Sequence, residues 1–139
     1  MVMTIVRNAV DRLRSAGIPP TLQRIAIAEV LFARPVHLSA EQVLARVRIQ
    51  MPEVSRATVY NTLKLFREKK MVRELVIDPE RVFYDSNTAP HYHIFDVSTG
   101  ELSDVAADEL RVVGTPELPE GLELEEVDVI IRVRSRIAR

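Results

Sequence analysis

The three histidines of this 139-residue chain are the residues whose types and spacing indicate metal chemistry. His91 and His93 flank Tyr92. In a β-strand they project from the same face about 7 Å apart, so one small cation can bridge both imidazoles. His37 comes from the first half of the chain. If it joins the pair, the metal clamps the two halves together.

Two carboxylates, Asp85 and Asp104, bracket the histidine pair. If a hairpin turns at positions 98 and 99, residues equally far from the turn face each other, and His93 stands opposite Asp104 on one face. A loop of odd length would turn Asp104 to the other face. Asp85 can reach the same point from the end of the preceding strand. The candidate metal ligands are His37, Asp85, His91, His93 and Asp104.

This donor set favours one class of metal. Three imidazoles and two carboxylates without sulfur suit Fe(II) or Mn(II) in five or six coordination better than a closed tetrahedral zinc site. The chain has no cysteine, which excludes a cysteine-ligated structural zinc, a disulfide and a reactive thiol. A lone His-x-His on a strand is more often a solvated face than a ligand pair. The register of Asp104 and the lack of further histidines favour the metal.

The elements that must position these donors are clearest in the first half. A helix is expected over about 5–16, and Thr21 can cap a second helix that is apolar on nearly every face and should be the buried centre. Ser39 and Gln42 form a capping box for a third helix, and Ser55 begins a fourth. Two β-rich runs follow, at 71–78 and 81–86. Together these elements predict a winged helix-turn-helix.

The fourth helix, over about 56–69, has the pattern of a helix that contacts DNA. Val59, Leu63 and Phe66 are spaced to face inward. The opposite stripe carries polar and basic side chains, namely Tyr60, Asn61, Lys64 and Arg67, together with Ala57. Residues 1–84 hold 14 basic against 8 acidic side chains, whereas residues 85–139 hold 5 against 12. A basic first half and an acidic second half predict a polyanion partner for the first half.

In the winged-helix interpretation the fourth helix enters the major groove of double-stranded DNA. Tyr60 and Ala57 can touch thymine methyl groups, and Asn61 or Arg56 can hydrogen-bond to base edges or phosphates. The remaining polar residues are better placed for phosphates. The alternative for Tyr60 is a half-buried core tyrosine. The expected DNA-binding residues are Thr21, Gln23, Arg24, Arg56, Ala57, Thr58, Tyr60, Asn61 and Lys64.

The second half is expected to be β-rich. Strands are predicted over about 91–96 and 101–105, and the alternation of apolar residues over 124–134 predicts a further strand with one apolar face. The fold class is α+β, with a winged helix-turn-helix domain over 1–84, a hinge over 85–90 and a small α/β dimerisation and metal-sensing domain over 91–139. No apolar run is long enough to cross a bilayer and no secretion signal is found, so a cytoplasmic location is expected.

From about residue 13 to residue 133 the chain resembles the ferric uptake regulator family of bacterial metal-responsive repressors, and within it the peroxide-sensing branch. The strongest resemblance is in segment 54–63 (VSRATVYNTL), which is similar to the recognition helix of the family. Segment 20–24 (PTLQR) resembles the entry to the second helix, and segment 91–93 (HYH) resembles the metal-binding strand. The lack of cysteine is also similar to the iron-response regulator branch, which senses iron status through haem.

The resemblance implies a function and an assembly. His37, Asp85, His91, His93 and Asp104 would form the regulatory Fe(II) or Mn(II) site, and His37 and His91 would be the redox-sensing histidines that peroxide oxidises. The protein would be a homodimer through its second half, would bind a pseudo-palindromic operator and would not be an enzyme. It departs from most relatives because it has no cysteine pairs for a structural zinc, and segment 114–121 is short and proline-rich where relatives have a long helix.

Three alternatives remain open on the sequence. A regulator of the same family could respond to iron, manganese or haem rather than peroxide, although the Cys-Pro haem motif is missing. A small metallohydrolase could use the histidines and Asp104 around an open metal position, but it gives no role to the basic first half. A DNA-binding module with an incidental histidine pair is the third.

Overall fold

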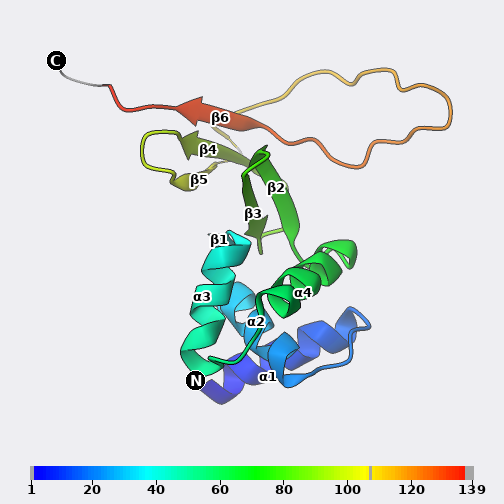
Figure 1. Ribbon diagram of the computed structural model, residues 1–139. Helices are drawn as coiled ribbons and strands as arrows, with labels where there is room; N and C mark the ends of the chain where they lie inside the picture. The colour runs from blue at the N-terminus through cyan, green and yellow to red at the C-terminus, as the bar shows by residue number, and fades with distance from the viewer. Residues whose placement is uncertain (1, 107, 137–139) are drawn as a thin grey trace. The chain divides into compact units, whose positions relative to one another are not determined.

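The computed structural model describes residues 2–106 and 108–136. The chain divides into two compact units, Met1–Thr88 and Ala89–Arg139. The first unit holds all the helices of the described residues, and the second contributes a small β-sheet (Figure 1). The α+β class expected from the sequence is therefore confirmed. The hinge at 85–90 and the dimerisation role of 91–139 stay predictions.

The first unit is a winged helix-turn-helix. Its elements are α1 (Val2–Ser15), α2 (Leu22–Phe32), β1 (His37–Leu38), α3 (Ala40–Gln50), α4 (Arg56–Glu68), β2 (Arg73–Asp78) and β3 (Arg81–Asp85). The strands form an antiparallel sheet in the order β1-β3-β2. The expected hairpin is β2 and β3, which forms the wing.

Local hydrogen bonds explain where these helices begin and end. The side chains of Thr21, Ser39 and Ser55 each accept a hydrogen bond from a backbone N–H three residues on. The capping box at α3 is complete, since the Gln42 side chain accepts from the Ser39 N–H at 2.9 Å. Gly17 follows α1 with φ of 75°, which favours glycine. The predicted helix starts of α2, α3 and α4 are confirmed.

The core of the first unit is built on α2 and α4. Val59, Leu63 and Phe66 are fully buried, as expected, and the Phe66 ring lies 6.1 Å from that of Phe32. The expectation that α2 is buried on nearly every face is wrong for Leu22, which is 77% exposed. Leu22 is the first residue of α2, and the buried residues of that helix lie in its second half.

A short strand that the sequence did not reveal brings His37 into the sheet. β1 contains only His37 and Leu38 and pairs with the end of β3. At the His37–Asp85 end of this pairing, the Val36 N–H donates to Ser86 Oγ and the Ser86 N–H donates to the Val36 carbonyl, both at 3.0 Å. Two residues are too few to produce an alternating pattern, so hydrophobic periodicity could not predict this strand.

The second unit is a three-stranded sheet. Its strands are β4 (Tyr92–Asp96), β5 (Leu102–Val105) and β6 (Ile130–Val133), in the order β5-β4-β6. β5 is antiparallel to β4 and β6 is parallel to it. The strand predicted over 124–134 was too long, because β4 offers pairing partners only for residues 130–133.

A long loop joins β5 to β6 (Figure 1). Its described residues form no helix or strand. Several of its apolar side chains are exposed, among them Val112, Val113, Leu122, Leu124 and Val127. None of the helices in the described part of the chain has the length and hydropathy to span a membrane.

Ser39 tests whether local capping stabilises the first unit. Ser39→Ala removes the acceptor at the start of α3, so we expect the free energy of unfolding of this unit to fall by about 1 kcal/mol. Ser39→Asp keeps an acceptor at the same position and serves as the control. Urea unfolding followed by circular dichroism measures both variants. Equal free energies of unfolding in Ser39→Ala and Ser39→Asp would show that the side-chain acceptor at position 39 does not stabilise the unit.

Candidate metal centre and DNA-contact surface

The first unit supplies one pair of metal donors. His37 of β1 and Asp85 of β3 face each other in the antiparallel register, so their side chains leave the same face of the sheet. Asp85 is buried, with 1% of its surface exposed, and its Oδ1 accepts a hydrogen bond of 2.8 Å from the Asn87 N–H. The Asp85 carboxylate thus lies beside His37 and offers oxygen atoms that a divalent cation can bind.

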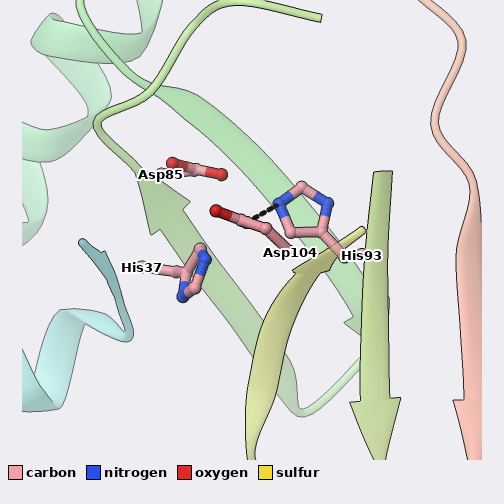
Figure 2. Close-up of side chains that lie close together, drawn as sticks. All are labelled: His37, Asp85, His93 and Asp104. Atoms are coloured by element: carbon pink, nitrogen blue, oxygen red, sulfur yellow. Dashed lines mark ion pairs between the residues drawn. The ribbon is translucent and has the colours of Figure 1, made fainter. Parts of the chain in front are cut away.

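The second unit supplies another group of donors. His93 of β4 stands opposite Asp104 of β5, which confirms the register expected from the sequence. Asp104 Oδ1 lies 3.5 Å from Nε2 of His93 and 3.5 Å from Nε2 of His91. Figure 2 draws His37 and Asp85 from the first unit together with His93 and Asp104 from the second, and its dashed line marks the ion pair between His93 and Asp104.

His91 lies immediately before β4, one residue outside the strand in which we expected it. Its Nδ1 is 2.6 Å from the Ala89 carbonyl oxygen. Because a carbonyl only accepts, Nδ1 carries the proton and Nε2 presents its lone pair in the neutral ring. The His91 and His93 rings lie 4.5 Å apart in an edge-to-face arrangement. A backbone contact of this kind orients a histidine as a metal ligand.

The donor spacing in the second unit fits a shared ion. Two donors that each lie about 2.1 Å from a metal are about 3.0 Å apart at a right angle and about 3.6 Å apart at 120°, the two angles that occur in five-coordination. Asp104 Oδ1 is 3.5 Å from both imidazole Nε2 atoms. Nothing in this group is sulfur, and His93 is almost fully buried. These three residues can therefore hold a borderline or hard divalent ion with open positions left for other ligands.

The expected DNA-binding residues lie on α4 and at the start of α2. An open pocket of about 300 Å³ between these helices is lined by Thr21, Gln23, Arg24, Thr58, Asn61 and Thr62. Arg24 already donates to the Pro19 carbonyl at 2.8 Å, and the Thr58 hydroxyl accepts from Ser55 Oγ. The pocket therefore groups polar side chains from two helices with the positive N-terminal end of α2, which suits a phosphate.

The remaining expected DNA-binding residues, Arg56, Ala57, Tyr60 and Lys64, are exposed on α4. Tyr60 is 43% exposed, so it is not a core residue. Sequence reasoning missed Glu41 of α3, which forms an ion pair with Arg56 and accepts a hydrogen bond of 3.1 Å from the Tyr60 hydroxyl. No sequence pattern links Glu41 to α4, because the contact depends on how α3 packs against α4.

A polar chain links the wing to α4. Tyr84 lies opposite Glu74 in the wing, and burial together with this neighbouring carboxylate raises the pKa of the Tyr84 phenol above its usual range. Glu74 also lies 3.8 Å from Nε of Arg67 on α4. Tyr84 immediately precedes Asp85 in β3. The strand that carries a candidate metal ligand is therefore linked to the helix on which most of the expected DNA-binding residues lie.

Comparison with known proteins gives one family. The profile of the Ferric uptake regulator family matches residues 15–132. The chain is 32% identical over 108 residues to a peroxide-responsive repressor, PerR, of Staphylococcus aureus, an alignment that covers 78% of this chain and 73% of that protein.

Solved structures have the same fold. The ferric uptake regulator of Pseudomonas aeruginosa with manganese is 27% identical and superposes with a TM-score of 0.69 over 93% of this chain and 98% of that one. The Helicobacter pylori ferric uptake regulator, described with three functional metal-binding sites, is 18% identical with a TM-score of 0.69, over 98% and 92% of the two chains. The winged helix and the small second unit are therefore the fold shared with these regulators.

Asp104 tests the donor group of the second unit. Asp104→Asn removes the anionic oxygen that lies next to both imidazoles. We expect Mn(II) affinity to fall by at least about tenfold, as loss of a residue that holds a metal or its ligands usually causes. Isothermal titration of Mn(II) measures the change, and Glu101→Gln, an exposed change on the same hairpin, is the control. Equal affinities in Asp104→Asn and the wild type would remove Asp104 from the site.

Proposed function

Since this chain belongs to the ferric uptake regulator family, we propose that it is a metal-dependent transcriptional repressor that releases its operator when peroxide oxidises a ligand histidine. Members of the family are metal-responsive transcriptional regulators and not enzymes, which removes the metallohydrolase alternative. The observation that carries the proposal is the approach of Asp104 Oδ1 to both Nε2 atoms of His91 and His93, each at 3.5 Å.

The proposed regulatory site has five ligands, His37, Asp85, His91, His93 and Asp104. Its support is the pairing of donors within each unit, since His37 faces Asp85 and His93 faces Asp104 across neighbouring strands. One ion that binds both groups would fix the orientation of the DNA-binding unit. Metal binding would then be required for operator binding.

Fe(II) or Mn(II) is the proposed ion. Nitrogen and carboxylate donors in five or six coordination suit these ions, and the relative from Pseudomonas aeruginosa was solved with manganese. The chain has no cysteine for a structural zinc. Raw affinity would still favour zinc or copper, so availability in the cell must select the ion.

Peroxide sensing is proposed for His37 and His91. Fe(II) held by these ligands would catalyse cleavage of the O–O bond of hydrogen peroxide, and the two electrons of the net reaction would come from the imidazole. In the net reaction one peroxide oxygen enters an imidazole C–H bond and the other leaves as water, so the imidazole is oxidised by two electrons. The oxidised ring binds the metal more weakly. The similarity to the Staphylococcus aureus peroxide-responsive repressor supports this branch.

For DNA, we propose that α4 reads base edges in the major groove. Thr21, Gln23 and Arg24 at the start of α2 and Lys64 on α4 would contact phosphates, while Arg56, Ala57, Thr58, Tyr60 and Asn61 lie on the reading helix. The basic balance of the first 84 residues supports a DNA partner. The contacts from Tyr84 through Glu74 to Arg67 offer a route from the metal ligand strand to this helix.

A homodimer through the second unit is the proposed assembly. β5 and β6 are both edge strands, and edge strands are ready to pair with another chain. Exposed apolar side chains in the β5 to β6 loop and at Val133 add surface for such an interface. A two-fold dimer would present two α4 helices and so would suit a pseudo-palindromic operator. Because DNA is the partner, the proposal places the protein in the cytoplasm.

The alternative function is an iron-, manganese- or haem-responsive regulator of the same family without peroxide sensing. The structural likeness to the Pseudomonas aeruginosa ferric uptake regulator with manganese supports this alternative. The candidate metal site is compatible with both functions. The two functions share the metal ligands and the DNA-binding surface. They differ in whether peroxide oxidises a ligand histidine.

His37→Ala tests whether the first unit takes part in the metal site. We expect the variant to keep its helical circular dichroism and to lose Mn(II)-dependent binding to an operator, since one ligand of the clamp is gone. The operator is first selected with the wild-type protein and Mn(II) from a pool of random-sequence duplexes, and binding is measured by fluorescence anisotropy. Metal dependence equal to that of the wild type would show that His37 is not a ligand.

Peroxide treatment separates the two functions. After exposure of the Fe(II) form to hydrogen peroxide, mass spectrometry should find one added oxygen atom on the peptide holding His37 or His91, with loss of operator binding. The Mn(II) form treated identically is the control and should stay unmodified. Loss of DNA binding without oxygen on either peptide would contradict peroxide sensing and favour the alternative.

A further inference from the structure

Glu41 approaches the DNA-contact face of α4 from a neighbouring helix. Glu41 lies in the first turn of α3, and its Oε1 pairs with Arg56 and accepts the Tyr60 hydroxyl at 3.1 Å. The side chains of Arg56 and Glu41 are 58% and 54% exposed. A single carboxylate therefore holds two exposed side chains that sit one helical turn apart on α4.

The Glu41 carboxylate pairs with the same guanidinium group that would bind a DNA phosphate. Arginine binds carboxylates and phosphates through the same planar fork of N–H donors. While Glu41 accepts from Arg56, the guanidinium charge is already balanced within the protein. Binding of a phosphate by Arg56 would then release fewer counterions from DNA, and counterion release drives binding to unrelated sequences.

Arg56 has further donors that Glu41 does not use, because a guanidinium carries five N–H groups and the ion pair is made through one nitrogen. An arginine held at one end keeps a fixed direction. Such a residue can still reach one base edge or phosphate of a matching operator, but it cannot adapt to the variable phosphate positions of an unrelated duplex.

We propose that Glu41 is a specificity determinant of DNA binding. It holds Arg56 and Tyr60 in place and so weakens binding to unrelated duplexes more than binding to the operator. This inference rests on the proposed function, in which α4 reads DNA. An exposed ion pair is weak in water, so the operator can compete with Glu41 without a large loss of affinity.

The test compares Glu41→Gln with the wild type as Mn(II)-loaded full-length proteins. Anisotropy titrations use the selected operator and a scrambled duplex of the same length, between about 50 and 200 mM salt. Glu41→Gln should bind the scrambled duplex about two- to fivefold more tightly, the change expected from release of one exposed ion pair. The slope of log affinity against log salt should steepen by about one, and operator affinity should change less.

Glu68→Gln is the matched control. It removes the same charge from the far end of α4, twelve residues from Arg56 and therefore about 18 Å along the helix axis. The double variant Glu41→Gln with Arg56→Gln tests whether Glu41 acts through Arg56. The gain in affinity for the scrambled duplex should vanish when Arg56 is absent. Circular dichroism confirms that each variant keeps its helices.

Two results would overturn the inference alone. One is Glu41→Gln behaving like Glu68→Gln on the scrambled duplex, and the other is an equal gain on both duplexes, which leaves the specificity ratio unchanged. A gain in affinity for the scrambled duplex that persists without Arg56 would show that Glu41 does not act through Arg56. If the Mn(II)-loaded wild type binds no duplex at all, the proposed function fails together with this inference.

Discussion

The strand register that sets Asp104 opposite His93 is the constraint on which the candidate metal centre depends. A shift of one residue would turn Asp104 to the other face of the hairpin and separate it from both imidazoles. In the register that is present, Asp104 Oδ1 lies 3.5 Å from the Nε2 atoms of both His91 and His93. The Ala89 carbonyl holds the proton on Nδ1 of His91, which leaves the Nε2 lone pair for a metal. Backbone pairing thus prepares nitrogen and oxygen donors for a divalent ion.

The same principle operates in the first unit with different elements. The two-residue strand β1 brings His37 opposite the buried Asp85, and contacts between Val36 and Ser86 hold that short pairing in place. From there the wing contacts α4 through Glu74 and Arg67. A metal-responsive regulator needs its metal site to influence its DNA-binding unit. Short strand pairings and a small polar chain provide a physical connection within this unit.

Much of this arrangement follows from local sequence rules. Thr21, Ser39 and Ser55 predict the helix starts because capping depends on residues only three positions apart. The relation of His93 to Asp104 follows from counting along a hairpin. β1 and the contact of Glu41 with α4 could not be predicted, since each depends on elements that meet only in the folded unit. The strand at 124–134 was overestimated because alternation does not reveal whether a partner strand exists.

We propose that donors of both units bind one regulatory ion. The most direct measurement is a crystal structure of the protein with Mn(II), with the ion located by anomalous scattering. We expect a single strong peak within bonding distance of His91, His93 and Asp104 and also of His37 and Asp85. A peak bound by one unit alone, or no peak beside the Asp104 carboxylate, would contradict it.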